Sequence, residues 1–312
     1  MALNFEKTER FPANAKVSEV FVERTPFAVS MRDAVQLRGF RYRVRNGGNK
    51  RNHLPVLCIP SDLGNAMEFD RFARQLLMQE NGPTALYSVS LRGRGGSDAG
   101  SVATYSPLIA AEDIISVCDA LNVHEVALLA NAGGALPALL MAPKRPALIE
   151  KLILNDAAPE RDDVGIARVR TLAKNHTPAK TLEDAIQREK DMLGSMFPAF
   201  GEPDWREKVE AAWHDGEKLT AEPAYDAALA RYFDSMNFED RQPLLWDEFK
   251  IFAARPVMAL RGEKSQLITQ RIIDKMRDIC PTLLERVVAG QGHFPLLTKD
   301  DLAVEIAAFL HS

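Results

Sequence analysis

Hydrophobic and polar positions along this chain form two kinds of segment, short apolar runs and longer amphipathic stretches. Short apolar runs bounded by Gly or Pro predict buried strands, and apolar positions three and four residues apart predict helices. The predicted strands lie within 21–42 and at 54–59, 85–91, 125–129, 149–154, 256–261 and 284–289, with a turn at 46–49. The predicted helices lie at 69–78, 107–121, 136–141, 269–279 and 300–310. Such alternation predicts an α/β fold with a mostly parallel sheet covered by helices on both faces.

The pattern changes between residues 159 and 250, where the chain becomes charged, helical and poor in strands. This segment contains all three tryptophans, Trp205, Trp213 and Trp246. A helical insertion between two strands of a parallel sheet would close over the carboxyl ends of the strands, where α/β proteins bind ligands. We therefore predict a core formed by residues 1–158 and 251–312, and an all-helical cap at 159–250.

The longest apolar run, residues 126–140, is typical of a buried strand, a sharp turn of small residues and a helix. This is the layout of a nucleophile elbow, G-x-S-x-G, in which the central serine is exposed on the turn. The turn here reads ANAGG at 130–134, so Ala132 occupies the position of the reactive serine. The scaffold of a catalytic site is therefore predicted, but the oxygen atom that would attack a substrate is missing.

Further motifs follow one another along the chain in a fixed order. They are LCIP at 57–60, GNAMEF at 64–69, LRGRGGSD at 91–98, LILNDAAP at 152–159, LRGEKS at 260–265 and GQGHFP at 290–295. With the elbow, they resemble the α/β-hydrolase superfamily, in particular its capped bacterial branch of esterases and hydrolases of aromatic ring-cleavage products. The resemblance extends from about residue 55 to the C-terminus. It implies an α/β-hydrolase fold, a cavity beneath the cap and no cofactor.

The resemblance also implies where each catalytic group should lie. The family's chemistry needs a nucleophile, a histidine base, an acid that orients the histidine, and two backbone N–H groups that stabilise the oxyanion. His293 matches the base, in a loop between the last strand and the last helix. Gly133 and Asp62 fall where the two oxyanion donors are expected. Gln266 stands at the acid position, directly after Ser265.

Several of these positions depart from the family pattern. Gln266 can accept a hydrogen bond from the imidazole but cannot offset its positive charge, and loss of the acid costs about 10⁴ in rate in such triads. Asp156, after the sixth strand, is an alternative acid. Asp62 brings a carboxylate to the oxyanion loop, where it either turns to solvent or, alone or with Ser61, forms a new acid–base group. Asn131 is one residue too early to be the nucleophile, but it borders the expected pocket.

Two explanations of Ala132 stay open. A single engineered change of serine to alanine would explain this position and nothing else. Natural divergence away from the Ser-His-Asp mechanism would also explain Gln266 and Asp62, and the combined departures favour it.

Composition and charge exclude several function classes. The net charge of −4 gives no overall basic balance for nucleic acid. The glycine-rich loop at 91–98 lacks the Lys-Ser/Thr that phosphate binding needs, and the other histidines have no metal-ligand spacing, so we expect neither a nucleotide nor a metal site. Three widely separated cysteines, no apolar leader and no membrane-length apolar segment lead us to expect a cytoplasmic protein with reduced thiols. The only expected partner is a small molecule, and the oligomeric state is undetermined.

Three functions therefore remain. The first is a hydrolase of a small apolar or aromatic carbonyl or ester compound, with its usual serine replaced. The second is a non-covalent catalyst of lyase, hydration or proton-transfer chemistry with His293 as general base. The third is a non-catalytic protein that binds a ligand in the same pocket.

Overall fold

The computed structural model describes residues 22–45, 53–160, 163–174, 177–220, 222–236 and 244–312. The turn predicted at 46–49 and His176 lie outside these residues. Its strands are β1 (Val22–Ser30), β2 (Gln36–Val44), β3 (Val56–Ile59), β4 (Leu86–Val89), β5 (Val126–Asn131), β6 (Ile149–Asn155), β7 (Val257–Gly262) and β8 (Leu284–Val288). Its helices are α1 (Asp70–Leu77), α2 (Pro107–Ala120), α3 (Ala135–Met141), α4 (Asp163–Lys174), α5 (Leu182–Leu193), α6 (Glu202–Ala212), α7 (Ala228–Ser235), α8 (Trp246–Lys250), α9 (Gln270–Ile279) and α10 (Leu302–His311).

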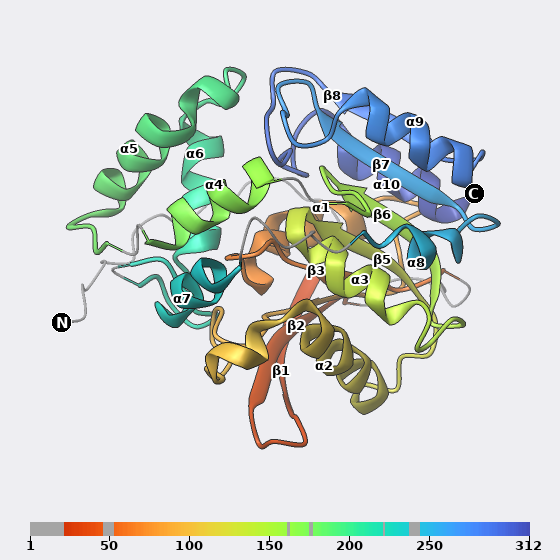
Figure 1. Ribbon diagram of the computed structural model, residues 1–312, viewed down its shortest axis with the longest axis horizontal. Coiled ribbons are helices and arrows are strands. Elements are labelled where there is room, and N and C mark those ends of the chain that lie inside the picture. The colour runs from red at the N-terminus through yellow and green to blue at the C-terminus, as the bar shows by residue number, and fades with distance from the viewer. Residues whose placement is uncertain (1–21, 46–52, 161–162, 175–176, 221, 237–243) are drawn as a thin grey trace.

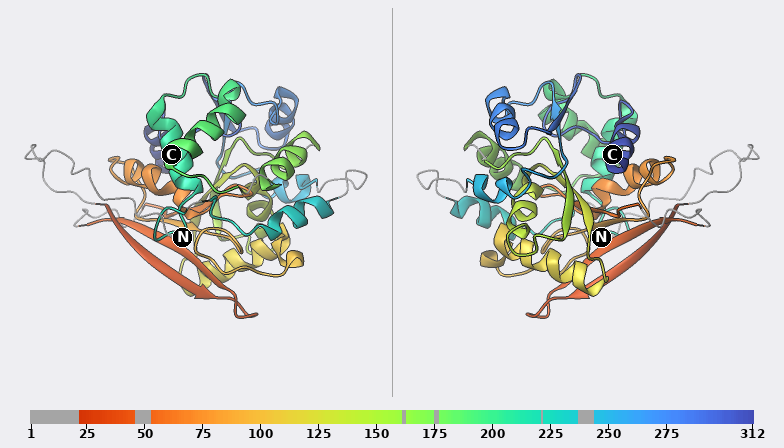
Figure 2. Two further views of the ribbon diagram at one scale, coloured as in Figure 1. Left: turned by 90° about the vertical axis from the view of Figure 1, so that its left-hand side faces the viewer. Right: turned by 90° about the vertical axis from the view of Figure 1, so that its right-hand side faces the viewer.

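The strands form one sheet in the order β1-β2-β4-β3-β5-β6-β7-β8. The β1–β2 and β2–β4 pairs are antiparallel, and the strands from β4 through β3 to β8 are all parallel to their neighbours. The predicted mostly parallel sheet is therefore confirmed, as are the antiparallel strands expected near the N-terminus. The β1–β2 hairpin extends away from the rest of the sheet (Figures 1 and 2).

Strand β5 shows why the sequence forms a two-sided sheet. All six of its residues are buried, and successive side chains point to opposite faces, as a strand requires. Val126, Leu128 and Ala130 join the core beneath α2, α3 and α9, while Ala127 and Leu129 join the core beneath α1 and α10. An uninterrupted apolar run is what a parallel strand needs when helices cover both of its faces.

Helices α4 to α7 lie between β6 and β7 in the sequence and gather on one side of the molecule (Figure 1). Helix α6 is tied to the core from two sides. The Asn65 side chain donates to the carbonyl of Ala211 at 2.9 Å, and Lys299 pairs with Asp204 at 2.7 Å. The predicted helical insertion is therefore present. Trp246, however, was expected in the cap and instead packs with the sheet's core, because α8 returns to that core.

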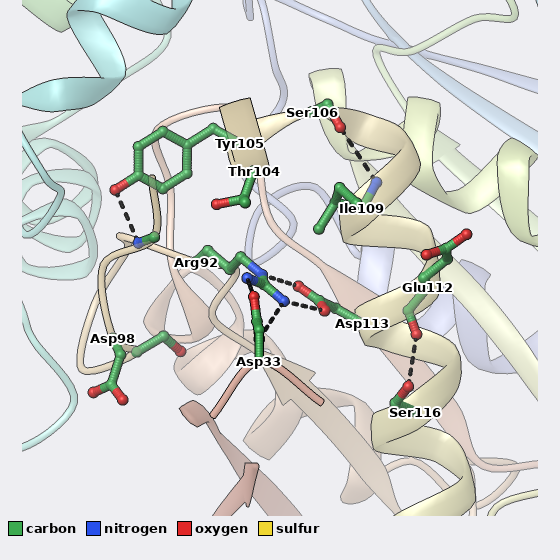
Figure 3. A network of polar contacts seen from close by, with 12 residues as sticks. Asp33, Arg92, Asp98, Thr104, Tyr105, Ser106, Ile109, Glu112, Asp113 and Ser116 are labelled. Carbon is green, nitrogen blue, oxygen red and sulfur yellow. Dashed lines mark hydrogen bonds and ion pairs between the residues drawn. The ribbon is translucent and has the colours of Figure 1, made fainter. Parts of the chain in front are cut away.

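The glycine-rich loop after β4 is fastened by a buried arginine (Figure 3). Arg92 makes two hydrogen bonds to Asp113 of α2, at 2.6 and 2.9 Å, and also contacts both carboxylate oxygens of Asp33 in the β1–β2 turn. These hydrogen bonds and ion pairs raise the pKa of the guanidinium, and the Arg92 hydrogen bond lowers the pKa of Asp33. The loop therefore serves as a structural connection between β4, α2 and the β1–β2 turn.

None of the described helices is both long and apolar enough to cross a membrane.

The close approach of the elbow to β3 gives a first test. A Cβ atom at Gly134 would lie 2.4 Å from the carbonyl oxygen of Pro60, which is part of the backbone and has little room to move. We expect Gly134→Ala to lower the free energy of unfolding by about 1–3 kcal/mol, because overpacking at a rigid contact strains the fold. Chemical denaturation measures this. Gly194→Ala is the matched control, since no atom lies within 4 Å of its added Cβ, and equal stability of the two variants would contradict the expectation.

Candidate active site

The turn after β5 has the backbone of a nucleophile elbow. Ala132 has φ of +46°, in the left-handed region that non-glycine residues rarely adopt, and it begins the short helical turn Ala132–Gly134 that leads into α3. Its side chain is 7% exposed and lines the cavity described below. The strand-to-helix turn therefore presents position 132 as a reactive residue would be presented, with a methyl group in place of a hydroxyl.

His293 lies in the loop after β8, and the structure shows which residue holds it. Its Nδ1 is 2.7 Å from Oδ2 of Asp156, the residue that follows β6. Asp156 is 1% exposed and also accepts hydrogen bonds from the Gly262 N–H at 3.1 Å and the Ser265 hydroxyl at 2.6 Å. A carboxylate at Nδ1 accepts a hydrogen bond from the Nδ1–H, which leaves Nε2 as the basic nitrogen of the neutral ring. His293 lines the cavity, so this pair can act as a general base.

Asp156, and not Gln266, is therefore the hydrogen-bond partner of His293, which corrects the expectation for the acid position. Gln266 is exposed. The physical reason is the adjacency of β6 and β7, since the N–H of Asp156 bonds to the carbonyl of Leu260 at 2.7 Å. An acid at the end of β6 thus lies beside the loop after β7 and reaches the histidine from there.

The oxyanion loop is held from two sides. Arg94 donates two hydrogen bonds to the carbonyl oxygen of Asp62, at 2.9 and 2.7 Å, and burial lowers the pKa of this arginine to about 10. On the other side, the N–H and the hydroxyl of Ser61 donate to Glu68 at 3.0 and 2.6 Å. Ser61 and Asp62 both line the cavity.

Glu68 is a site residue that the sequence reasoning missed. It belongs to the GNAMEF motif at 64–69, which was noted for its glycine and its spacing. The signal that could have revealed Glu68 was an acidic residue between Met67 and Phe69 in a largely apolar stretch. Burial raises the pKa of Glu68, and this is opposed by its hydrogen bonds from Ser61 and Asn131 and by the charge of Lys208. The carboxyl therefore holds its proton to a higher pH than a solvated glutamate does.

Asn131 does not line the main cavity but supports Glu68 from below. Its amide donates to Glu68 at 3.0 Å, and its oxygen accepts from the Asn155 amide at 2.9 Å. Asn155 also donates to the carbonyl of Pro295 at 2.9 Å, two residues after His293. Asn131 and Asn155 are 2% and 0% exposed, so this buried chain of hydrogen bonds links the oxyanion loop to the loop of the histidine.

A cavity of about 190 Å³ lies between the insertion and the carboxyl ends of the strands. Its floor includes Ala132, Glu68 and His293, and much of its remaining wall is apolar. The insertion adds charged side chains to the wall, namely Arg168 of α4, Glu189 of α5, and Glu207 and Lys208 of α6. The pocket is thus more polar than one shaped for a purely apolar compound.

Aromatic residues of the insertion divide between packing and the cavity. Phe200 and Trp213 line the cavity. Trp205 and Phe197 instead pack within the insertion's own core, and Phe233 packs in a separate cluster with Tyr105. Only part of these aromatic residues therefore borders the cavity.

Among the described residues, no group of three or more His, Cys, Asp or Glu side chains could hold a metal ion.

Comparisons with known proteins identify the family and the fold. A family model described as alpha/beta hydrolase fold matches residues 55–300. Esterase YbfF of Escherichia coli (strain K12) is 20% identical over 268 residues, which are 83% of this chain and 93% of that protein. The crystal structure of an alpha/beta hydrolase from Novosphingobium aromaticivorans DSM 12444 is similar with a TM-score of 0.82 at 24% identity, over 93% of this chain and 99% of that one.

A second solved structure, that of E-2-(acetamidomethylene)succinate hydrolase, is similar with a TM-score of 0.72 at 18% identity. The match covers 93% of this chain and 100% of that chain. At such identities the two solved structures report a shared fold.

The histidine's partner can be tested without a substrate. In Asp156→Asn, the amide oxygen is expected to stay at the Gly262 N–H, which turns the amide N–H₂ toward His293 Nδ1. Nδ1 must then accept a hydrogen bond from this amide, so it cannot carry the ring proton. We therefore expect the ring proton to move to Nε2. Histidine ¹⁵N chemical shifts measure the tautomer. Gln266→Ala should keep the wild-type tautomer, and a tautomer change in that variant alone would reverse the assignment.

Proposed function

This chain belongs to the alpha/beta-hydrolase fold family, and we propose that it is an enzyme that acts on a small carbonyl compound by general-base catalysis, without a serine ester intermediate. One observation carries this proposal. His293 is held by the buried carboxylate of Asp156 at 2.7 Å and borders the same cavity as Ala132, which has no hydroxyl. The base and its orienting acid are retained while the nucleophile is absent.

The geometry supports a water molecule or a substrate carbon as the source of the proton that His293 removes. In ester hydrolysis, Nε2 would take a proton from water while the water oxygen bonds to the carbonyl carbon. In lyase or hydration chemistry, the same nitrogen would take a proton from carbon or from water. A positioned general base contributes roughly 10²–10⁴-fold to such reactions.

The rest of the site supports the same assignment. The backbone N–H groups of Gly133 and Asp62 correspond to the positions that stabilise an oxyanion in this family. Arg94 and Glu68 hold the loop that carries the Asp62 N–H. The esterase relative and the hydrolase-like fold favour an ester or a related carbonyl compound as substrate. Charged residues on the insertion favour a compound with at least one polar group.

A second function, acyl transfer through a serine at position 132, is favoured by one observation. The left-handed backbone at Ala132 is the conformation in which an elbow presents its nucleophile. The site would then need only the hydroxyl to carry out serine chemistry. A purely ligand-binding role has less support, because binding alone does not need a buried carboxylate aligned with the histidine.

The histidine gives the direct test. We expect His293→Gln to lower the rate of phenyl acetate hydrolysis by roughly 10²–10⁴-fold, because the base is lost while the ring's volume is largely kept. Ala132→Gly should keep the rate within a few-fold, since the methyl group takes no part. The release of phenol under substrate saturation measures both. Equal losses in the two variants would argue that the cavity binds substrate but that His293 is no base.

The elbow gives a gain-of-function test. Ala132→Ser should create an acyl-serine enzyme, with a stoichiometric burst of p-nitrophenol from p-nitrophenyl acetate and an acetyl adduct on residue 132. Stopped-flow absorbance and mass spectrometry of the quenched protein measure the two signals. The parent chain, with alanine at 132, is the control and should show neither. A folded Ala132→Ser protein with no adduct would show that the elbow is misaligned with His293.

A further inference from the structure

A second pair of polar side chains borders the cavity apart from His293. The Ser61 hydroxyl donates to Oε1 of Glu68 at 2.6 Å, and both residues line the cavity with Ala132. The other carboxylate oxygen, Oε2, accepts from the Ser61 N–H and the Asn131 amide, each at 3.0 Å. The carboxyl is therefore fixed in position, and its hydrogen-bonded hydroxyl lies on the loop where an oxyanion would form.

Support of the loop alone does not require a carboxyl here. A glutamine at position 68 could accept the same two N–H bonds at its oxygen and donate from its N–H₂ to the Ser61 hydroxyl. It would do so without the cost of placing an ionisable group in a poorly solvated wall. What glutamate adds is a proton that can be given and taken back. Gly64 makes room for this group, because a Cβ at Gly64 would lie within 1.6 Å of Oε1.

We propose that Glu68 and Ser61 form the proton-donating half of the site, in which Ser61 delivers a proton to the substrate's carbonyl oxygen and Glu68 replaces it. This inference rests on the proposed general-base function of His293. In this arrangement, the base removes a proton on one side of the substrate while the Glu68–Ser61 pair supplies one on the other. The pair thereby performs acid catalysis in a site without a serine nucleophile.

The proton balance for ester hydrolysis is as follows. His293 takes a proton from water as the water oxygen bonds to the carbonyl carbon, and the carbonyl π electrons move onto the carbonyl oxygen. When Glu68 is protonated on Oε1, the hydrogen bond to Ser61 is reversed, so that Glu68 donates to the Ser61 oxygen and the Ser61 hydroxyl turns to the carbonyl oxygen. That oxygen takes the Ser61 hydroxyl proton, and the Glu68 carboxyl proton moves to the Ser61 oxygen. The neutral tetrahedral adduct then collapses as the imidazolium gives its proton to the leaving alkoxide. One adduct hydroxyl returns its proton through Ser61 to Glu68, and the products are a carboxylic acid and an alcohol.

The charges around the pair permit a protonated carboxyl. Lys208 of α6 faces Glu68 and favours its charged form, while burial favours the neutral form and has the larger effect. The other titratable or charged groups that line the cavity are Asp62 of the oxyanion loop, Arg168 of α4, Glu189 of α5, Glu207 of α6, Tyr225 and His293. Burial raises the pKa of Glu189 and of Glu207 as well.

The first experiment measures the proton itself. Infrared difference spectra between the wild-type protein and Glu68→Gln should contain a protonated carboxyl C=O band that disappears only above the ordinary titration range of glutamate. Ser61→Ala should shift this band, because the hydroxyl bonded to Oε1 is removed. Glu207→Gln is the matched control and should leave the band in place. Disappearance of the Glu68 band within the ordinary titration range of glutamate would overturn the proposal, whatever the enzyme's activity on any substrate.

The second experiment uses phenyl acetate hydrolysis as a function of pH. The donor must be protonated, so the wild-type rate should fall as the pH rises through the pKa of Glu68. Glu68→Gln and Ser61→Ala should each lose roughly 10²-fold in kcat and lose this alkaline decline, and their combination should lose little more. Ser61→Thr, which keeps a hydroxyl, should recover most of the rate and the alkaline decline. If Ser61 and Glu68 only supported the loop, their variants would lose activity without losing the alkaline decline.

The outcomes separate this inference from the proposed function. If His293→Gln loses activity while Glu68→Gln keeps both the wild-type rate and its alkaline decline, the proton-donating role is wrong and the general-base role stands. If His293→Gln keeps full activity, the general-base role falls on its own evidence. Thermal unfolding of Glu68→Gln checks that its fold is retained, and Glu68→Asp is the second variant should that substitution prevent folding.

Discussion

Burial of the central sheet on both faces confines polar chemistry to the ends of its strands. Strand β5 has no exposed residue, and its side chains alternate between two apolar cores. Polar groups at the carboxyl ends are therefore shielded from water and must satisfy one another. The Asn155–Asn131–Glu68–Ser61 chain and the Asp156–His293 pair are two results of this constraint. The site is thus a consequence of how the sheet is buried as much as of any single motif.

The same constraint explains why the oxyanion loop has both a hydrogen-bond donor and a hydrogen-bond acceptor as partners. Its backbone must hold a fixed direction to aim an N–H at the substrate, and a short loop has few contacts of its own. Arg94 donates to the carbonyl of Asp62, and Glu68 accepts from the N–H of Ser61. One buried cation and one buried carboxyl therefore fix adjacent peptide units from opposite sides. The raised pKa of Glu68 and the lowered pKa of Arg94 both follow from this burial.

The sequence predicted the structural features that depend on residues close together along the chain. The apolar run at 126–140, the small residues of the turn and the position of His293 after the last strand all concern neighbours in sequence, and the fold drawn from them is confirmed. The partner of His293 depends instead on which strands are adjacent in space. Asp156 was weighed as an alternative to Gln266, but only the β6–β7 pairing shows which of them reaches the ring.

Other features required knowledge of packing. Trp246 lies within the charged, strand-poor stretch, yet α8 returns it to the main core, because segment composition does not determine which helix docks where. Glu68 was hidden inside a motif whose glycine carried the resemblance, and its importance comes from the three donors that converge on it. Asn131 borders the elbow in sequence but faces Glu68 rather than the main cavity. Convergence of this kind is a tertiary property that no spacing rule describes.

The absence of a hydroxyl at the elbow bears on the role of the histidine more than on the fold. The positive φ at Ala132 is imposed by the turn from β5 into α3, so the elbow backbone forms with alanine at this position. A histidine beside a serine needs only to move a proton between two oxygens of a covalent cycle. Without a serine, the proposed base His293 acts on water or on the substrate itself, and negative charge still develops on the carbonyl oxygen. A proton source on the oxyanion loop then becomes an advantage, and Glu68, linked to that loop through Ser61, is the group placed to supply it.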